Sequence, residues 1–215
     1  MEQAKVYFSD LRAPIGTNLL KKLEKLIRTA GIDGIDMEKK LVAIKIHFGE
    51  PGNLSFLRPN YAKVVADVVK SMGGVPFLTD CNTLYVGRRK NALEHMDAAY
   101  ENGFSPFSTG CQIIIGDGLK GTDDVEVPVE GAEYIQTAKI GRAIMDADVF
   151  ISLTHRVWRR HQEHRHGLRF PPGQDGAAQF RQARGKQEEM CGLSPVRQTV
   201  RPGCHLLRSR PEGQH

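Results

Sequence analysis

The chain has 215 residues, of which 40% are hydrophobic and 26% are charged. This composition is typical of a soluble globular protein and excludes a chain that is disordered throughout. The sequence has no apolar run near the roughly 18–20 residues that a membrane-spanning helix needs, and its N-terminus lacks the apolar core of a signal peptide. We therefore expect a cytoplasmic protein without a membrane span.

Hydrophobic periodicity predicts alternating strands and helices up to residue 153. The predicted strands cover residues 5–8, 41–46, 75–78, 113–115, 125–127 and 149–153, and the predicted helices cover 18–28, 59–72, 88–102 and 132–147. Such alternation is typical of β-α-β units. The expected fold class is α/β, a mostly parallel sheet with helices on both faces in Rossmann-like layers.

Polar residues follow several of the predicted strands. In open parallel sheets, ligands bind beyond the carboxyl ends of the strands. Residue types at these positions suit a metal ion or an anionic small molecule. The candidate ligand-binding residues are His47, Glu50, Asp80, Asn82, Asp117 and His155.

These candidates also have structural interpretations. Asp80 and Asn82 are common cap and turn residues that satisfy nearby backbone N–H groups. Asp117 lies between two glycines and fits a turn. His47 and His155, each taken alone, could be hydrogen-bonded structural histidines. Only their convergence at one sheet edge favours a binding site.

The four cysteines, Cys81, Cys111, Cys191 and Cys204, include no Cys-x-x-Cys pair. We expect reduced thiols in a cytosolic setting. Cys81 also fits inert burial. The run Arg88-Arg89-Lys90 near a predicted helix start is interpreted as a solvated basic turn, with anion binding as the alternative.

The net charge of +5 is unevenly distributed. Residues 1–155 hold 18 Lys+Arg and 20 Asp+Glu and sum to −2, whereas residues 156–215 hold 12 and 5 and sum to +7. Taken literally, the second segment predicts a disordered, Arg-rich tail that could bind nucleic acid through phosphates. We disfavour nucleic-acid binding because no RNA-binding motif accompanies the tail.

A shifted reading frame explains the abrupt change better. Back-translation of residues 156–167, moved one base forward, permits the peptide GFGGAIKNIGM. The same shift over residues 186–203 permits NKKRCVGCRPCVKQCARG. The Cys-x2-Cys-x2-Cys-x3-Cys spacing in that peptide is typical of bacterial ferredoxins. One of these cysteines is forced by the code at Met190-Cys191, and the other three are permitted by synonymous codons.

Three segments of the chain resemble one known family. Residues 45–50 (KIHFGE), 79–83 (TDCNT) and 151–155 (ISLTH) are similar to segments of the domain-of-unknown-function 362 family, whose members include uncharacterised iron–sulphur-centre proteins. The resemblance implies an α/β body followed by a glycine-rich stretch and ferredoxin cysteines. For intact relatives it implies 4Fe–4S clusters, electron transfer or another redox role, and a redox partner. It establishes no reaction.

This chain departs from that pattern after His155, where the shifted segment begins at once. Cys191 and Cys204 cannot replace the four cluster thiolates. We therefore expect residues 1–155 to form the α/β domain, residues 156–215 to be a frame-shifted, disordered tail, and the chain to carry no cofactor. The alternatives are a small-molecule or metal-binding α/β module and a nucleic-acid-binding protein. The partners of this chain are not predicted.

Overall fold

The computed structural model describes residues 5–129 and 136–154. Its centre is a parallel four-stranded sheet in the order β3-β2-β1-β6. The strands are β1 (Leu41–Ile46), β2 (Val75–Asp80), β3 (Gln112–Ile115) and β6 (Val149–Leu153). The expected α/β class with a mostly parallel sheet is confirmed.

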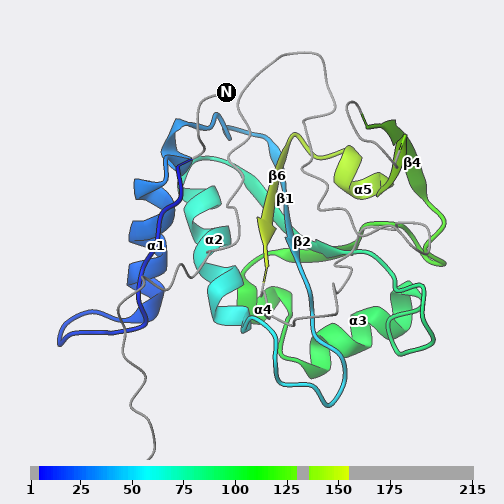
Figure 1. Cartoon of the computed structure of the whole chain (residues 1–215), viewed down its shortest axis with the longest axis horizontal. Helices are drawn as coiled ribbons and strands as arrows, with labels where there is room; N and C mark the ends of the chain where they lie inside the picture. Colours follow the sequence, from blue (N-terminus) through cyan, green and yellow to red (C-terminus); the bar gives the residue numbers. More distant parts are fainter. Residues whose placement is uncertain (1–4, 130–135, 155–215) are drawn as a thin grey trace, which may run out of the picture.

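Helices and a small hairpin surround this sheet. The helices are α1 (Leu19–Thr29), the 3₁₀ helix η1 (Ile32–Gly34), α2 (Pro59–Ser71), α3 (Ala92–Glu101), α4 (Pro106–Thr109) and α5 (Arg142–Met145). Strands β4 (Asp124–Pro128) and β5 (Thr137–Gly141) pair antiparallel in a separate sheet. Figure 1 shows α1 and α2 on one side of the main sheet and α5 with the β4–β5 pair on the other.

Local sequence explains where the long helices begin. The side chain of Asn18 accepts a hydrogen bond from the backbone N–H of Lys21 at 2.9 Å and caps α1. Pro59 starts α2, where its missing N–H costs nothing. Asn91 caps α3 by accepting from the backbone N–H of Glu94 at 3.0 Å. These caps satisfy backbone donors that the first helical turn leaves unpaired.

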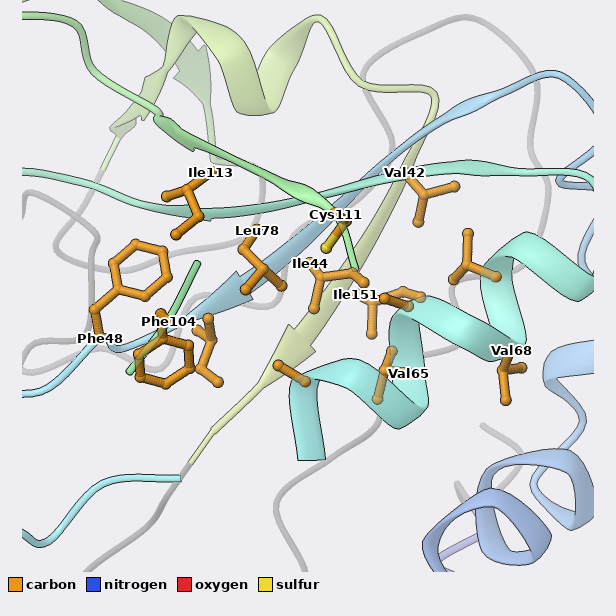
Figure 2. Packing of buried hydrophobic residues seen from close by; sticks show 14 of the residues in the cluster. Val42, Ile44, Phe48, Val65, Val68, Leu78, Phe104, Cys111, Ile113 and Ile151 are labelled. Atoms are coloured by element: carbon orange, nitrogen blue, oxygen red, sulfur yellow. The ribbon is translucent and has the colours of Figure 1, made fainter. Parts of the chain in front are cut away.

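The hydrophobic core lies between the sheet and α2. Ile44, Leu78 and Ile151 come from neighbouring strands and face Val65 and Val68 of α2 (Figure 2). Each is at most 3% exposed. Full burial of an aliphatic side chain contributes about 1.5–3 kcal/mol relative to exposure. This core holds the carboxyl ends of the central strands in register.

Two predicted elements are wrong, and a third is shorter than expected. Residues 5–8 form no strand, and Val6 and Phe8 are more than half exposed. The helix predicted over 132–147 is replaced, within its described part, by β5 and the four-residue α5. Alternate burial of Ala138 and Ile140, which pair with β4, gives that segment the two-residue period of a strand. Helix α3 begins at Ala92, because residues 88–91 form a turn and a cap.

The strand order sets the position of the site. All four strands are parallel. From β1 the chain adds β2 and then β3 toward one edge of the sheet, and it later adds β6 on the other side of β1. The order of the strands therefore reverses at β1, and such a reversal is where α/β sheets bind ligands. In the part of the chain that the structure describes, no helix is long and apolar enough to cross a membrane. The predicted tail, residues 156–215, lies outside the described residues.

Candidate functional site

The segment after β1 turns sharply back over the sheet edge. Gly49 adopts a positive φ of 87°, and a Cβ there would lie 2.7 Å from atoms of Phe56 and Asn102. Only glycine suits both constraints. The Asn102 amide also donates to the Phe48 carbonyl at 2.9 Å. This turn brings the next residue, Glu50, toward the carboxyl end of β2.

Asp80, the last residue of β2, lies at the centre of a buried charged cluster. Its carboxylate is 3.4 Å from Lys45 Nζ through one oxygen and 3.2 Å from Arg89 Nη1 through the other. All three side chains are less than 10% exposed. Burial raises the pKa of Asp80, but the positive charges around it, that of Lys45 foremost, outweigh burial and hold that pKa below its ordinary value. Asp80 is therefore an anion at neutral pH.

Arg89 connects Asp80 to Glu50. Its Nε and Nη2 atoms donate to Glu50 Oε1 at 2.8 and 2.5 Å. Tyr85 also hydrogen-bonds to Glu50, and its hydroxyl lies 2.7 Å from Arg89 Nη2. Burial raises the pKa of Glu50, yet the hydrogen bonds from Arg89 and Tyr85 leave that pKa lowered overall. The guanidinium thus joins the loops after β1 and β2, and the Arg89 carbonyl accepts from the backbone N–H of Thr83 at 2.8 Å.

Asn82 and Asp117 form a second polar bridge at the same edge. Asp117 follows β3 and accepts from the Asn82 backbone N–H at 2.9 Å and from its side-chain amide at 2.8 Å. The same amide donates to the Gly118 carbonyl at 2.9 Å. Both side chains are buried. These contacts favour the structural interpretation, in which the pair ties two strand ends together.

Two histidines border the cluster. His95 on α3 is fully buried, its Nε2 is 3.8 Å from Asp80, and its ring contacts Phe48 edge to face. Burial lowers the pKa of His95 to about 4, so the ring is neutral at pH 7. The Nδ1 of His47 accepts the Gly49 backbone N–H at 2.9 Å. His47 directly follows β1, whose Lys45 pairs with Thr79, the neighbour of Asp80 at the carboxyl end of β2.

Cys81 lies in a tight junction rather than in an open site. The residue is 4% exposed, and burial raises the pKa of its thiol to about 12. A Cβ on Gly141 would lie 3.0 Å from its Sγ and 2.6 Å from the Gly116 carbonyl oxygen. A protonated, enclosed thiol is a poor nucleophile and a poor metal ligand. The inert interpretation of Cys81 fits this environment.

The structure brings five of the six predicted site residues to one edge of the sheet. Glu50 and Asp80 share Arg89, Asn82 and Asp117 bind each other, and His47 follows β1 at the same edge. His155 lies outside the described residues. No group of three or more His, Cys, Asp or Glu side chains suitable for a metal ion occurs within residues 5–129 and 136–154. The described residues therefore lend the metal-binding alternative no support.

Sequence reasoning missed Lys45, Tyr85 and His95, and it misassigned Arg89. The basic run 88–90 was expected to be solvated, which is wrong for Arg89, because its side chain is only 3% exposed. Arg88 is exposed as expected and pairs with Glu101. A charged residue inside the apolar run of β1, Lys45, was the one available signal, because a lysine there needs a buried partner.

Comparison with known proteins agrees with the resemblance of the three segments. The model of the family described as "Domain of unknown function (DUF362)" matches residues 42–165. Searches of curated proteins and of solved structures give no match. The matched region starts in β1 and contains the cluster of Lys45, Asp80 and Arg89. It continues through residues 156–165, beyond the expected domain boundary at residue 155. That boundary stays a prediction. Because the match covers more than half of the chain, the protein belongs to the DUF362 family.

Proposed function

We propose that the chain is the ligand-binding α/β body of a redox-associated protein, with a small molecule bound at the carboxyl edge of β1 and β2. The observation that carries this proposal is the buried cluster of Lys45, Asp80 and Arg89. Buried ion pairs rarely stabilise a fold more than apolar side chains of similar volume. Charge concentrated at a strand-end site therefore points to a role beyond folding.

The redox part of the proposal comes from the family resemblance. In intact relatives we propose that 4Fe–4S clusters accept or donate electrons next to the ligand site. In this chain the four-cysteine spacing arises only in the shifted frame, so we propose that it binds no cluster. The cysteines Cys81 and Cys111 are buried and unbridged, which fits the reducing cytoplasm that we propose as its location.

The missing cluster can be tested directly. Iron and acid-labile sulphide are measured on the purified full-length chain after anaerobic reconstitution. Neither should be stoichiometric, because no four-thiolate set is in register. A bound 4Fe–4S cluster, recognised by its absorption and electron paramagnetic resonance spectra, contradicts the proposal for this chain. Sequencing the DNA across codons 150–215 then tests the shifted frame itself.

The ligand site is tested by a thermal-shift screen of small metabolites against the full-length chain. A molecule that binds is then titrated into His47→Ala, His155→Ala and Lys25→Ala. His47→Ala should weaken binding at least several-fold, because His47 follows β1 at the sheet edge where Asp80 ends β2. Lys25→Ala, on the exposed side of α1, is the control and should bind as the wild type does. Equal affinity in wild type and both histidine variants removes this site.

A further inference from the structure

We propose that Arg89 binds an oxyanion and that Glu50 occupies its donor atoms in the absence of a ligand. A phosphate or carboxylate ligand then binds Arg89 by displacing Glu50. This inference rests on the proposed function and names the ligand class of the same site. Glu50 then acts as an internal substitute for the ligand.

The guanidinium of Arg89 is divided between two carboxylates. Its Nη1 faces Asp80, which is 1% exposed and closes the inner side. Its Nε and Nη2 form the outer edge, and both donate to one oxygen of Glu50, at 2.8 and 2.5 Å. That edge is the fork with which arginine binds carboxylate and phosphate in bidentate fashion. The position in which an oxyanion would bind Arg89 is therefore occupied by the side chain of Glu50.

Burial increases from Glu50 inward. The side chain of Glu50 is 29% exposed, whereas that of Arg89 is 3% exposed. A ligand that arrives from solvent therefore meets Glu50 first. The Tyr85 hydroxyl hydrogen-bonds to both Glu50 and Arg89, and Tyr85 is 55% exposed. It gives the incoming oxyanion a further hydrogen-bond donor on the exposed side of Arg89.

The charges of the cluster favour an anion over a cation. Lys45 and Arg89 carry two positive charges against one on Asp80, and His95 is neutral at pH 7. Glu50 brings this group to zero. When Glu50 leaves, one buried positive charge stays uncompensated, which is costly unless another anion replaces it. A metal ion would instead have to displace both cations from Asp80.

The neighbouring pair Arg88–Glu101 provides a matched control. Arg88 Nη1 and Nη2 bind the two oxygens of Glu101 at 2.6 and 2.7 Å, so the chemistry is the same one residue away. Both side chains are about half exposed, and water screens them. Neutralising Glu101 changes the net charge as much as neutralising Glu50 does, but it frees no donor atoms of a buried arginine.

The test uses isothermal titration calorimetry on the full-length chain at low, constant ionic strength. Inorganic phosphate and acetate are titrated separately, so that the two arms distinguish phosphate from carboxylate ligands. Glu50→Gln should bind one of these anions about tenfold more tightly than the wild type, because the competing carboxylate is gone. Glu50→Asp keeps the charge but has a side chain one methylene shorter, which moves the carboxylate away from Arg89. It should also bind the anion more tightly than the wild type does. Glu101→Gln should bind as the wild type does.

Three results overturn the inference. These are equal affinity in wild type and both Glu50 variants, an equal gain in Glu101→Gln, and a gain in Glu50→Gln that is absent in a well-folded Glu50→Asp. If Glu50→Gln does not fold, Glu50→Asp alone decides. The two proposals can also be separated. If a neutral metabolite binds the wild type and this binding is lost in His47→Ala, the proposed ligand site is supported. The proposal that the ligand is an anion that displaces Glu50 is then wrong.

Discussion

Asp80 keeps its charge where burial alone would neutralise it. Each of its two oxygens faces one cation, Lys45 or Arg89, and the three side chains are almost inaccessible to water. Attraction within such a group is strong because little solvent screens it. The same lack of solvent makes each member costly once its partner is lost. Asp80 is therefore the residue on which the stability of the cluster depends most.

Replacing Asp80 by Asn tests this dependence. The substitution keeps the shape and leaves two buried cations with too little negative charge. We expect the free energy of unfolding to fall by about 3–5 kcal/mol, measured by urea denaturation. Glu101→Gln, which removes a carboxylate from an exposed pair, should produce no measurable change. Equal effects of the two substitutions would show that the buried cluster contributes nothing special.

His95 makes stability depend on pH. The pKa of an unfolded histidine is near 6.5, and burial lowers the pKa of His95 to about 4. Between these values the unfolded chain binds one proton more than the folded chain, so stability falls as pH decreases from 6.5 toward 4. The loss from this residue is about 3 kcal/mol at the lower limit.

Urea denaturation at several pH values checks this contribution. His95→Gln should lack that part of the decline while keeping a neutral polar group beside Asn82 and Asp80. An unchanged slope between pH 6.5 and 4 in His95→Gln would assign the acid sensitivity to other groups.

The strand-end residues were predictable, whereas their partners were not. His47, Glu50 and Asp80 follow or end strands that the apolar pattern reveals, and parallel strands bring their carboxyl ends together. Arg89 belongs to a loop, and its side chain reaches 39 residues back along the sequence to Glu50. No local pattern encodes that contact. The buried environment of Arg89 arises only from the assembled fold.

At the scale of elements, three chain segments meet without room for a side chain. Gly141 ends β5, Gly116 follows β3, and Cys81 follows β2. A Cβ on Gly141 would lie 2.6 and 2.7 Å from backbone atoms of Gly116, which cannot rotate away. The close approach fixes α5 and the β4–β5 pair against the ends of the main strands.

Gly141→Ala should therefore lower the free energy of unfolding by about 1–3 kcal/mol, because overpacking against backbone forces the segments apart. Gly34→Ala is the matched control, since nothing lies within 4 Å of a Cβ there. It should change the free energy by less than about 0.5 kcal/mol. Thermal or urea denaturation of both variants measures the difference. A neutral Gly141→Ala would mean that the junction separates easily.

The same junction explains which elements the sequence could not predict. Parallel strands such as β1 and β6 have continuous apolar runs that identify them directly. Residues 137–145 contain small and apolar residues that fit a helix equally well. Pairing with β4 decides in favour of a strand, and pairing is a tertiary contact. Tertiary context thus overrides local periodicity at the segment that closes the second face of the sheet.

At the scale of the whole molecule, the described part carries exposed apolar side chains on several segments. Leu11 and Ile15 are 80% and 108% exposed in the N-terminal segment, and Val86 and Phe107 are 96% and 100% exposed in later ones. Within the described residues, β6 pairs with β1 alone and ends the sheet. Parallel sheets are normally covered on both faces and extended by their crossover connections. Exposed apolar side chains and an edge strand both favour association between chains.

We expect the full-length chain to be marginally stable and to associate in solution. Size-exclusion chromatography with light scattering should give a mass that rises with concentration, because exposed apolar side chains and the edge strand β6 of the described sheet favour contacts between chains. Thermal unfolding should be broad and end in aggregation. The matched comparison is the chain encoded once the proposed frame shift after codon 155 is reversed, and that chain should be monodisperse and melt sharply. A monodisperse monomer with a sharp, cooperative melt in the chain as it stands would show instead that residues 1–155 form a complete domain.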